Sequence, residues 1–383
     1  MTSSETAPRL PWDAADPYPY YESRRREGAV VWDEVAEAWL VVGYHPAQQI
    51  LSGSSWTSNP LANLNAPAAF RLLGADILRR NMLTTDGPDH LRLRNAVRDV
   101  FTRSFITGLA AGVEELASAT IDHAVAGVEF DFMADIALPL PIAVAAAWLG
   151  LDVDTARLLR EESPAIARML GDFADPDTVE AGTSAFATLL TELLPLAADR
   201  RTHPQDDLLS FIGAATDLEL DDVVTIAVLI AVAGHETTAN LLGSAMIRDL
   251  DGQTTPVDDK LATELLRLDG PVQAVGRTAT TQQMIDDVTV RAGDPVLVVL
   301  AAANRDPAVF HQPNDFRPGR AGPAPLSFGY GAHYCLGAAL ARLEIVTALQ
   351  HILARAPMLC GEPTWRDTPA IRGPLTLPIV FAK

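Results

Sequence analysis

Residues 328–337 read FGYGAHYCLG, and this short stretch decides how the rest of the chain is interpreted. Three glycines surround one cysteine, Cys335, and the helical pattern ALARLEIVTALQHIL follows directly. Glycines let the backbone turn tightly and aim N–H groups at the sulfur. Those N–H groups and the dipole of the following helix stabilise a thiolate. The stretch therefore predicts a tight loop that delivers one thiolate at a helix N-terminus.

The chemistry of this cysteine loop favours iron over zinc. A single thiolate, with no second Cys or His at metal-ligand spacing, is typical of the axial ligand of a heme iron. Zinc takes about four ligands, which this segment does not supply. The alternative is a buried free cysteine beside a turn. The glycine-rich loop favours the ligand, so Cys335 is predicted to bind iron.

A second unusual segment lies inside an apolar helical pattern, where residues 233–238 read AGHETT. Glycine inside a helix costs about 0.5–1 kcal/mol relative to alanine. An acid and two threonines at the end of an apolar run are also unfavourable, and such violations indicate a functional site. Ala233 and Gly234 would let a flat ligand approach the backbone. Glu236 and Thr237 would form an acid–alcohol pair able to relay protons.

Other interpretations of the AGHETT segment are possible. It could be a capped helix end with a solvated Glu236. His235-Glu236 also begins the HExxH pattern of zinc proteases, but that pattern needs His at position 239, where this chain has Ala239. A threonine here could bond back to the carbonyl four residues earlier, and this would open the helix locally.

An acid and a base lie three residues apart in the ELLR segment, at Glu264 and Arg267. On a helix they share one face and can pair. Such pairs are usually solvated surface bridges worth a few tenths of a kcal/mol. Arg320, in the FRPGR segment just before the cysteine loop, could lock Glu264 into a three-way network.

A set of basic residues could form a cradle for two carboxylates. His90 and Arg94 are one helical turn apart, so both point to one side of a helix. Arg277 and His333 would complete the cradle. Taken singly, each of the four is more often an ordinary surface residue, and together with a heme site they indicate propionate ligands.

Composition excludes several classes of protein. The chain has 383 residues, 48% of them hydrophobic and 20% charged, so a large core is expected and wholesale disorder is not. A net charge of −20 argues against a general nucleic-acid binder. Two cysteines cannot supply an iron–sulfur cluster. The longest apolar stretch, residues 223–234, is short of the roughly 20 needed to cross a bilayer. We expect a cytoplasmic protein without a membrane segment.

Hydrophobic periodicity predicts a mostly helical fold with a minor β-sheet part. Residues 89–215 show helical patterns, and a long apolar helix is expected to begin at Asp221-Asp222. A small hairpin is expected over residues 30–42, and strand-like runs return at 286–303 and 376–382. No Gly/Ser-rich linker stands out, so residues 1–383 are predicted to be a single domain.

The three motifs FGYGAHYCLG, AGHETT and ELLR, in this order, resemble those of the cytochrome P450 family of heme-thiolate monooxygenases. The resemblance spans nearly the whole chain, from DPYPYYESRRREG through DGPDHLRLR and ANRDP, and is most similar to the soluble bacterial type. It implies the family's triangular prism, with heme b between the long central helix and the helix after Cys335. The region between Thr238 and Glu264 is short for the family, and its DLDGQTTPVDD segment is expected to be a loop.

The resemblance implies a role for each matched position. Cys335 would be the proximal iron ligand, Glu236 and Thr237 would deliver protons to dioxygen, and Glu264, Arg267 and Arg320 would form a structural triad. The other heme-binding residues would be His90, Arg94, Ala233, Gly234, Arg277, Phe328, Gly329, His333 and Gly337. The expected pocket residues, which could equally be core residues, are Met82, Leu83, Ile230, Gln273, Ala274 and Leu375.

The implied reaction inserts one oxygen atom of O2 into a hydrophobic small organic substrate, such as a terpenoid, steroid, fatty acid or polyketide. Residues 336–383 leave no room for a fused reductase, so electrons are expected from a separate ferredoxin or flavodoxin and its NAD(P)H-dependent reductase. The basic residues expected to dock that donor are Arg92, Arg98, Arg103 and Arg342. The alternatives are peroxide-driven or oxidative coupling chemistry, or a heme-dependent binding or sensor protein.

Overall fold

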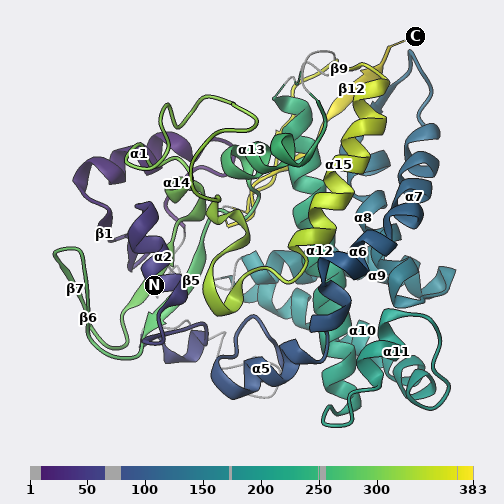
Figure 1. The fold of residues 1–383 in the computed structure, drawn as a ribbon, viewed down its shortest axis with the longest axis horizontal. Coiled ribbons are helices and arrows are strands. Elements are labelled where there is room, and N and C mark those ends of the chain that lie inside the picture. The colour runs from purple at the N-terminus through teal and green to yellow at the C-terminus, as the bar shows by residue number, and fades with distance from the viewer. Residues whose placement is uncertain are drawn as a thin grey trace, which may run out of the picture.

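The apolar run after Asp221 forms α12 (Leu220–Ile247), a 28-residue helix through the middle of the molecule (Figure 1). The computed structural model describes residues 10–64, 79–171, 175–248, 250, 256–368 and 370–382. Asp222 caps the start of α12, where its carboxylate accepts a hydrogen bond from Glu219 N–H at 3.2 Å. The expected acidic helix start is therefore present.

Helices dominate the described residues, as the hydrophobic periodicity predicts. Figure 1 shows most of them on one side of the molecule, where α15 runs beside α12. The helices besides α12 are α1 (Tyr18–Glu27), α2 (Tyr44–Ser52), α5 (Gly87–Asn95), α6 (Arg103–Gly108), α7 (Ala110–Asp122), α8 (Pro139–Leu149), α9 (Val153–Gly171), α10 (Pro176–Thr202), α11 (Leu208–Gly213), α13 (Asp259–Asp269), α14 (Leu300–Ala303) and α15 (Ala338–Ala354).

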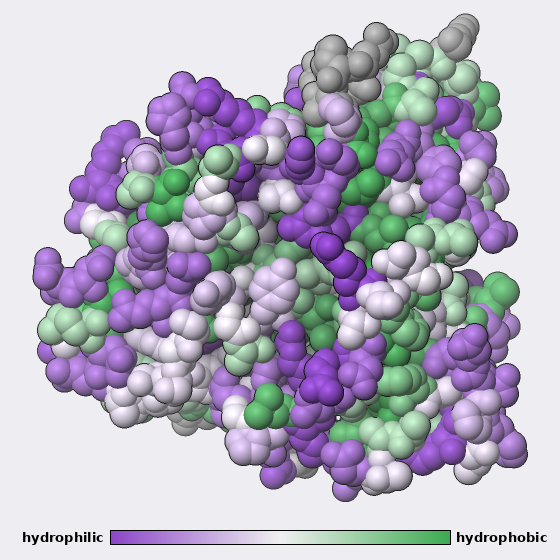
Figure 2. All heavy atoms as spheres, in the orientation of Figure 1, coloured by the Kyte–Doolittle hydropathy of each residue, from purple (hydrophilic) through white to green (hydrophobic). Residues whose placement is uncertain are grey.

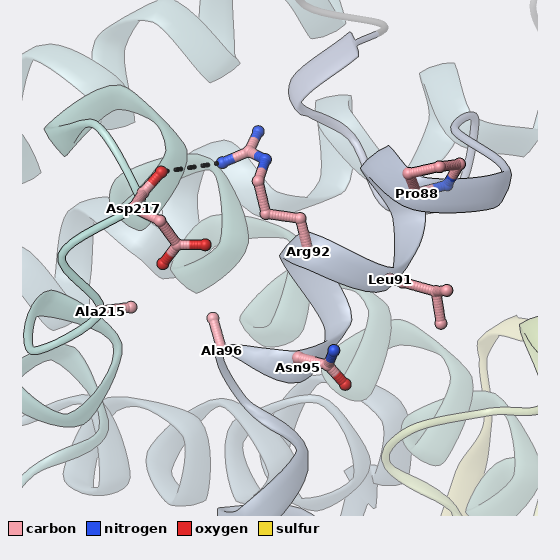
Figure 3. A pocket seen from close by; sticks show the side chains of 7 residues that line it. All are labelled: Pro88, Leu91, Arg92, Asn95, Ala96, Ala215 and Asp217. Atoms are coloured by element: carbon pink, nitrogen blue, oxygen red, sulfur yellow. Dashed lines mark hydrogen bonds between the residues drawn. The ribbon is translucent and has the colours of Figure 1, made fainter.

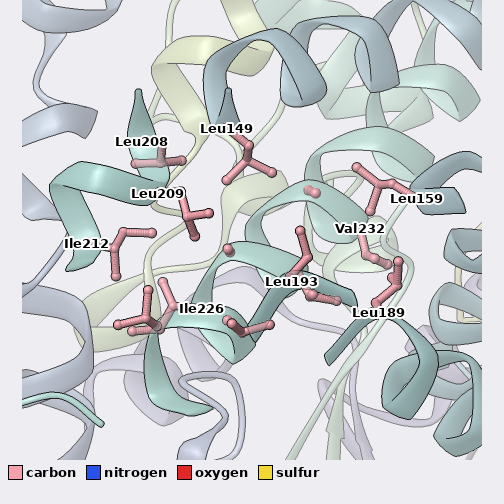
Figure 4. Close-up of a cluster of buried hydrophobic side chains, with 14 of the residues drawn as sticks. Leu149, Leu159, Leu189, Leu193, Leu208, Leu209, Ile212, Ile226 and Val232 are labelled. Atoms are coloured by element: carbon pink, nitrogen blue, oxygen red, sulfur yellow. The ribbon is translucent and has the colours of Figure 1, made fainter. Parts of the chain in front are cut away.

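Leucine, isoleucine and valine side chains fill the space between α12 and its neighbours (Figure 4). Leu149 of α8, Leu189 of α10 and Ile226 of α12 belong to this cluster, and each is at most 2% exposed. Burying each such side chain contributes about 1.5–3 kcal/mol. The cluster therefore holds α12 rigidly, and α12 carries the AGHETT segment.

The strands of the first sheet lie on the opposite side of the molecule from most helices (Figure 1). The first sheet has the order β1-β2-β8-β5-β3, with only β2 and β8 parallel. The expected hairpin is confirmed, because Trp32 pairs with Trp39 across β1 and β2. The strands of this sheet are β1 (Val30–Asp33), β2 (Ala38–Val41), β8 (Pro295–Val298), β5 (Val275–Ala279) and β3 (Trp56–Thr57).

Smaller antiparallel sheets tie distant parts of the chain together. The late strand-like runs are confirmed by β7, β8 and β12, except that Leu300–Ala303, at the end of the first run, forms helix α14. The short strand β4, which the sequence did not indicate, joins β12 inside the otherwise helical region. The strands are β4 (Glu129–Asp131), β12 (Pro378–Phe381) and β9 (Pro357–Leu359); β6 (Gln283–Ile285) and β7 (Val288–Val290); and β10 (Thr364–Trp365) and β11 (Pro374–Thr376).

Two of the described helices, α10 and α12, are long and apolar enough to cross a membrane by length and composition alone. A buried core helix meets the same criterion. The apolar part of α12 is mostly covered by other elements, and α10 packs against α9 and α12. On the face in Figure 2, hydrophilic side chains predominate, and apolar ones show between them over the helices around α15.

Two segments that the sequence predicts as loop are only partly described. α12 continues to Ile247 and α13 begins at Asp259, while residues 249 and 251–255 lie outside the described residues. The sequence from about Ser52 to Met82, rich in Ser, Asn, Pro and Ala, also predicts loop with short helices, and residues 65–78 of it lie outside the described residues. Its described part holds the short strand β3 and one 3-10 turn, Pro60–Ala62.

Candidate functional site

The cysteine loop has the tight backbone that its glycines predict. Two 3-10 turns, Leu326–Phe328 and Gly331–His333, precede α15, and Cys335 N–H donates to Phe328 O at 2.8 Å. Gly331 has φ +73°, and a Cβ there would lie 2.5 Å from Leu51 O. Only glycine fits such a position without strain.

The thiol of Cys335 lies where donors and positive charge can stabilise an anion. Burial raises its pKa, whereas the backbone N–H of Gly337 and the charge of Arg94 lower it. Burial keeps water away from the sulfur, while the Gly337 N–H and the charge of Arg94 favour the thiolate. This combination is typical of a thiol that binds a cation.

The middle of α12 has an open face of small residues. Ala233 and Gly234 are exposed, although the helix around them is mostly buried. A Cβ at Gly234 would have no atom within 4 Å. Thr237 Oγ1 donates to Ala233 O at 2.8 Å, which is the back-bond to the fourth residue before it. The helix nevertheless stays continuous from Leu220 to Ile247, so the expected local opening is absent.

Four basic residues come together beside the cysteine loop. The rings of His90 and His333 lie 4.2 Å apart, and burial with the nearby charges of His333, Arg94 and Arg277 lowers the pKa of His90 to about 4. Burial also lowers the pKa of Arg277. Arg94 donates to the carbonyl of Tyr334 in the cysteine loop.

Asp86 neutralises part of this basic cluster. His333 Nε2 lies 2.9 Å from Asp86 Oδ1 and 3.1 Å from Ser58 Oγ. The pKa of Asp86 falls to about 2, because hydrogen bonds from His333 and Thr57 outweigh its burial. His90 Nε2, by contrast, is buried and has no partner among the described residues. An orphaned nitrogen of this kind is suited to an added carboxylate.

The residues present fit a heme group. Its flat ring matches the open face at Gly234 and the glycine-rich loop, where a Cβ at Gly337 would also have no atom within 4 Å. Its two carboxylates match the basic cluster with the unpartnered His90 nitrogen. Its iron matches the single thiol of Cys335, because the described residues contain no group of three or more His, Cys, Asp and Glu that could hold another metal ion.

Glu236 is buried on α12 and contacts a cation that the sequence did not indicate. Its Oε2 lies 3.0 Å from Arg366 Nη1, while its Oε1 has no partner among the described residues. Burial raises the pKa of Glu236, and the charge of Arg366 opposes that rise. No motif surrounds Arg366, so only the tertiary structure places it here.

Glu264 receives donors from three arginines. Arg267 Nε and Nη2 donate to its two oxygens at 2.8 and 2.7 Å, and Arg320 Nε donates at 3.2 Å. The backbone N–H of Arg317 adds a bond at 2.9 Å. These hydrogen bonds and the charges of the arginines outweigh burial and lower the pKa of Glu264. The structure thus brings the expected three residues together.

A further buried carboxyl, Glu344 on α15, was missed in the sequence. Burial raises its pKa to about 8, and a hydrogen bond with Thr238 of α12 opposes the rise. A signal was present, because Glu344 stands on the same helix face as Leu340 and Ala348, where an apolar residue is expected. The neutral acid ties α15 to α12 next to Thr237.

The six expected pocket residues have different surroundings among the described residues, and their role in lining a pocket stays a prediction. Met82 is buried in the helical core, whereas the Leu83 and Leu375 side chains are 46% and 52% exposed. Both amide groups of Gln273 are hydrogen-bonded, to Tyr21 and to Gly270 O. Its buried side chain joins structural elements. Ala274 and Ile230 pack on separate hydrophobic clusters.

A described cavity of about 520 Å³ lies between α5 and the segment before α12 (Figure 3). Pro88, Leu91 and Asn95 line one wall. Arg92 reaches across it and donates to Asp217 O at 3.4 Å. The cavity has a mixed polar and apolar lining and is open to solvent, and none of the residues predicted for the heme lines it.

Most arginines expected to dock an electron donor already have acidic partners. Arg92 pairs with buried Asp222 at 3.0 Å, Arg98 with Asp99 at 3.3 Å and Arg342 with Asp259 at 3.1 Å. Arg103 forms no ion pair with any described residue and is exposed. Arg92 also holds the start of α12 through its ion pair with Asp222, and its role in docking stays a prediction.

Comparisons with known proteins agree with this geometry. The family model for cytochrome P450 matches residues 243–360. The chain is 35% identical to the cytochrome P450 monooxygenase PikC of Streptomyces venezuelae, over 96% of this chain and 91% of that protein. It is 32% identical to cytochrome P450 107B1 of Saccharopolyspora erythraea, over 99% of both. The chain belongs to the cytochrome P450 family.

Solved structures show the same fold. The ligand-free CYP164A2 of Mycobacterium smegmatis superposes with a TM-score of 0.84 at 32% identity, over 95% of this chain and 96% of that one. P450BioI in complex with an acyl carrier protein ligated to hexadec-9Z-enoic acid superposes with a TM-score of 0.89 at 28% identity, over 96% and 98%. The predicted fold is confirmed, and members of this family bind heme b and are heme-thiolate monooxygenases.

Proposed function

We propose that this enzyme hydroxylates or epoxidises a hydrophobic small organic molecule in the cytoplasm. A separate ferredoxin or flavodoxin, with its NAD(P)H-dependent reductase, supplies the electrons. The substrate and O2 consume two electrons and two protons, and the products are the oxygenated substrate and one water. The observation that carries this proposal is the partly buried thiol of Cys335, with its Gly337 N–H donor, on the loop before the helix that packs against α12.

Each predicted site residue has a task in this proposal. Cys335 holds the iron, and the small residues Ala233, Gly234, Gly329 and Gly337 with Phe328 accommodate the ring. The bound heme supplies the dioxygen activation and oxygen transfer that no amino-acid side chain can perform. The protein supplies orientation, exclusion of water and protons.

The basic cluster and the ion network have supporting tasks. His90, Arg94, Arg277 and His333 bind the two carboxylates of the heme, and Asp86 holds the His333 ring in place through the bond at 2.9 Å. Glu264, Arg267 and Arg320 join α13 to the segment before the cysteine loop, which keeps that loop in position.

Glu236 and Thr237 manage the protons. The raised pKa of Glu236 keeps its proton available at neutral pH better than an exposed carboxyl would. The Thr237 hydroxyl lies on the open face of α12 and is held by Ala233 O. This pair favours O2 activation over the alternatives of peroxide-driven chemistry, oxidative coupling or a sensor, because those alternatives do not need it.

The comparisons support a hydrophobic substrate. P450BioI was solved with a fatty-acyl acyl carrier protein, and a mutant of P450 EryK, 27% identical to this chain, was solved with erythromycin B. The fatty-acyl chain of the first complex is an apolar ligand, which agrees with a hydrophobic substrate. For the electron donor, exposed Arg103 is the candidate contact because its charge is not neutralised by a described carboxylate.

One experiment tests the proposed function directly. The purified protein is loaded with heme, reduced and exposed to carbon monoxide, and the red-shifted absorption of a thiolate-bound heme is measured. A library of lipophilic compounds is then screened for spectral shifts and for product formation with NADPH and a generic ferredoxin chain. The spectrum must disappear in Cys335→Ser and persist in Cys360→Ser, a matched control on an exposed cysteine. Product formed only with added peroxide would contradict the proposal.

A further inference from the structure

The buried acid of α12 meets a single cation, which comes from the far end of the chain. Arg366 Nη1 lies 3.0 Å from Glu236 Oε2, and the side chains are 18% and 4% exposed. No other Lys or Arg of the described residues forms an ion pair with Glu236. Arg366 therefore connects a buried carboxyl to the outside of the molecule.

The position of Arg366 is fixed by the hairpin of β10 and β11. Its N–H donates to Gly373 O at 3.3 Å. Gly373 in turn presses on α12, because a Cβ there would lie 2.2 Å from Asn240 Oδ1, one helical turn after Glu236. A bridge between Val272 and Ile371 holds the tip of the hairpin. The hairpin backbone thus holds Arg366 in a defined position beside α12.

The contact gives a partner to only one of the two carboxyl oxygens of Glu236. Glu236 Oε1, Arg366 Nε and both amide atoms of Asn240 are buried and have no partner among the described residues. Buried polar atoms are normally hydrogen-bonded, often to internal water. The contact therefore has two unmet donors and two unmet acceptors, and internal water bound to them would supply the hydrogen bonds along which a proton moves.

We propose that Arg366 is a positioning residue for proton transfer, which holds Glu236 through Oε2 and leaves Oε1 free to carry the proton. This inference rests on the proposed role of Glu236. A proton enters from the hairpin side, binds Oε1 and leaves toward Thr237, so the carboxyl returns to its starting state. The other charged groups near this contact are His235, whose pKa burial and Arg366 lower to about 4, and Arg160 of α9.

The test measures the protonation of Glu236 in the heme-loaded enzyme. Its carboxyl band is identified by infrared spectroscopy as the band that Glu236→Gln removes, and is then titrated with pH. Arg366→Gln is expected to raise the midpoint by about one pH unit or more, because an adjacent cation favours the charged form. Arg366→Lys should restore most of the shift. Arg372→Gln is the matched control, because Arg372 lies on the same hairpin but donates to Ala15 O.

The second readout is the fraction of NADPH electrons that reach product. Arg366→Gln is expected to lower that fraction about tenfold and to enlarge the solvent deuterium isotope effect, with the carbon monoxide spectrum unchanged. An unshifted midpoint in Arg366→Gln, or an equal shift in Arg372→Gln, would overturn the role of Arg366. Intact coupling in Glu236→Gln would instead refute the proton role of Glu236 itself, so the two failures are distinguishable.

Discussion

Two buried glutamates, each on a helix and each facing arginines, behave in opposite ways. Glu264 receives hydrogen bonds on both oxygens from Arg267, with Arg320 adding more, and its pKa is lowered. Glu236 has one arginine on one oxygen, and its pKa is raised. Hydrogen bonds and positive charges on both oxygens favour the ionised carboxylate, whereas burial with only one partnered oxygen favours the protonated acid. The arrangement at Glu264 is suited to holding elements together, and the arrangement at Glu236 is suited to proton transfer.

The largest expected effect comes from breaking the satisfied network. Glu264→Ala would leave Arg267 charged, 2% exposed and without its acid, which costs about 3–5 kcal/mol when one partner of a buried pair is removed. We expect little heme-loaded protein and a much lower urea midpoint. Arg317→Ala is the matched control, because only its backbone contacts Glu264. Normal heme loading in Glu264→Ala would contradict the structural role.

Substitution of Glu236, which has a partner on only one oxygen, should lower the activity of the enzyme and leave its stability almost unchanged. Glu236→Gln keeps the volume of the side chain but cannot release a proton, so product formation is expected to fall by about 10²- to 10⁴-fold, the usual contribution of general acid–base catalysis. Heme content and the thermal midpoint should stay close to those of the parent enzyme. A loss of folded protein matching that of Glu264→Ala would erase the distinction between the two glutamates.

A smaller effect is expected at the alcohol beside Glu236. Thr237→Ala removes the hydroxyl that lies on the open face of α12. Heme and substrate should still bind and NADPH should still be consumed, but electrons should be released as hydrogen peroxide instead of product. Thr237→Ser keeps the hydroxyl and should retain coupling. Measured peroxide yields that are equal in the two variants would refute the proton role of Thr237.

The last effect, spread over several pH units, concerns Glu344, the third buried glutamate of the described residues, which forms no ion pair with any of them. Its pKa of about 8 in the folded state lies above its ordinary value of 4.5, so folding favours its protonated form. That stabilisation is present in full below pH 4.5 and is lost as the pH rises toward 8. Relative to Glu344→Gln, the free energy of unfolding should fall by up to about 1.4 kcal/mol per pH unit in that window. Parallel pH profiles of the two proteins in urea titrations would exclude a raised pKa.

The cysteine loop and the AGHETT segment could be recognised without the structure, because each contains residues that are unusual in a loop or in an apolar helix. The sequence shows directly a cysteine among glycines, and an acid with a glycine in an apolar helix. Its hydrophobic pattern also shows a mostly helical chain. Glu264 with Arg267 is also a local pair, three residues apart on one helix. These features depend on neighbours in sequence, which a linear reading contains.

The lining of the pocket was harder to predict, since it depends on how distant segments pack. Gln273 looked free to meet a substrate, yet Tyr21 from near the start of the chain donates to it. Arg92 looked like a docking residue, yet buried Asp222 takes its charge. Met82 is buried in the helical core. A residue's availability is a property of its surroundings.

The sequence by itself determined the family, the cysteine proposed to bind iron and the helix that carries the acid, because these are encoded in short runs of residues. Only the tertiary structure decided that Arg366 reaches Glu236 across 130 positions of the chain and leaves one carboxylate oxygen free. The physical reason is that a pKa and a proton path depend on burial and on charges a few ångströms away in space. Separation along the chain does not specify either one.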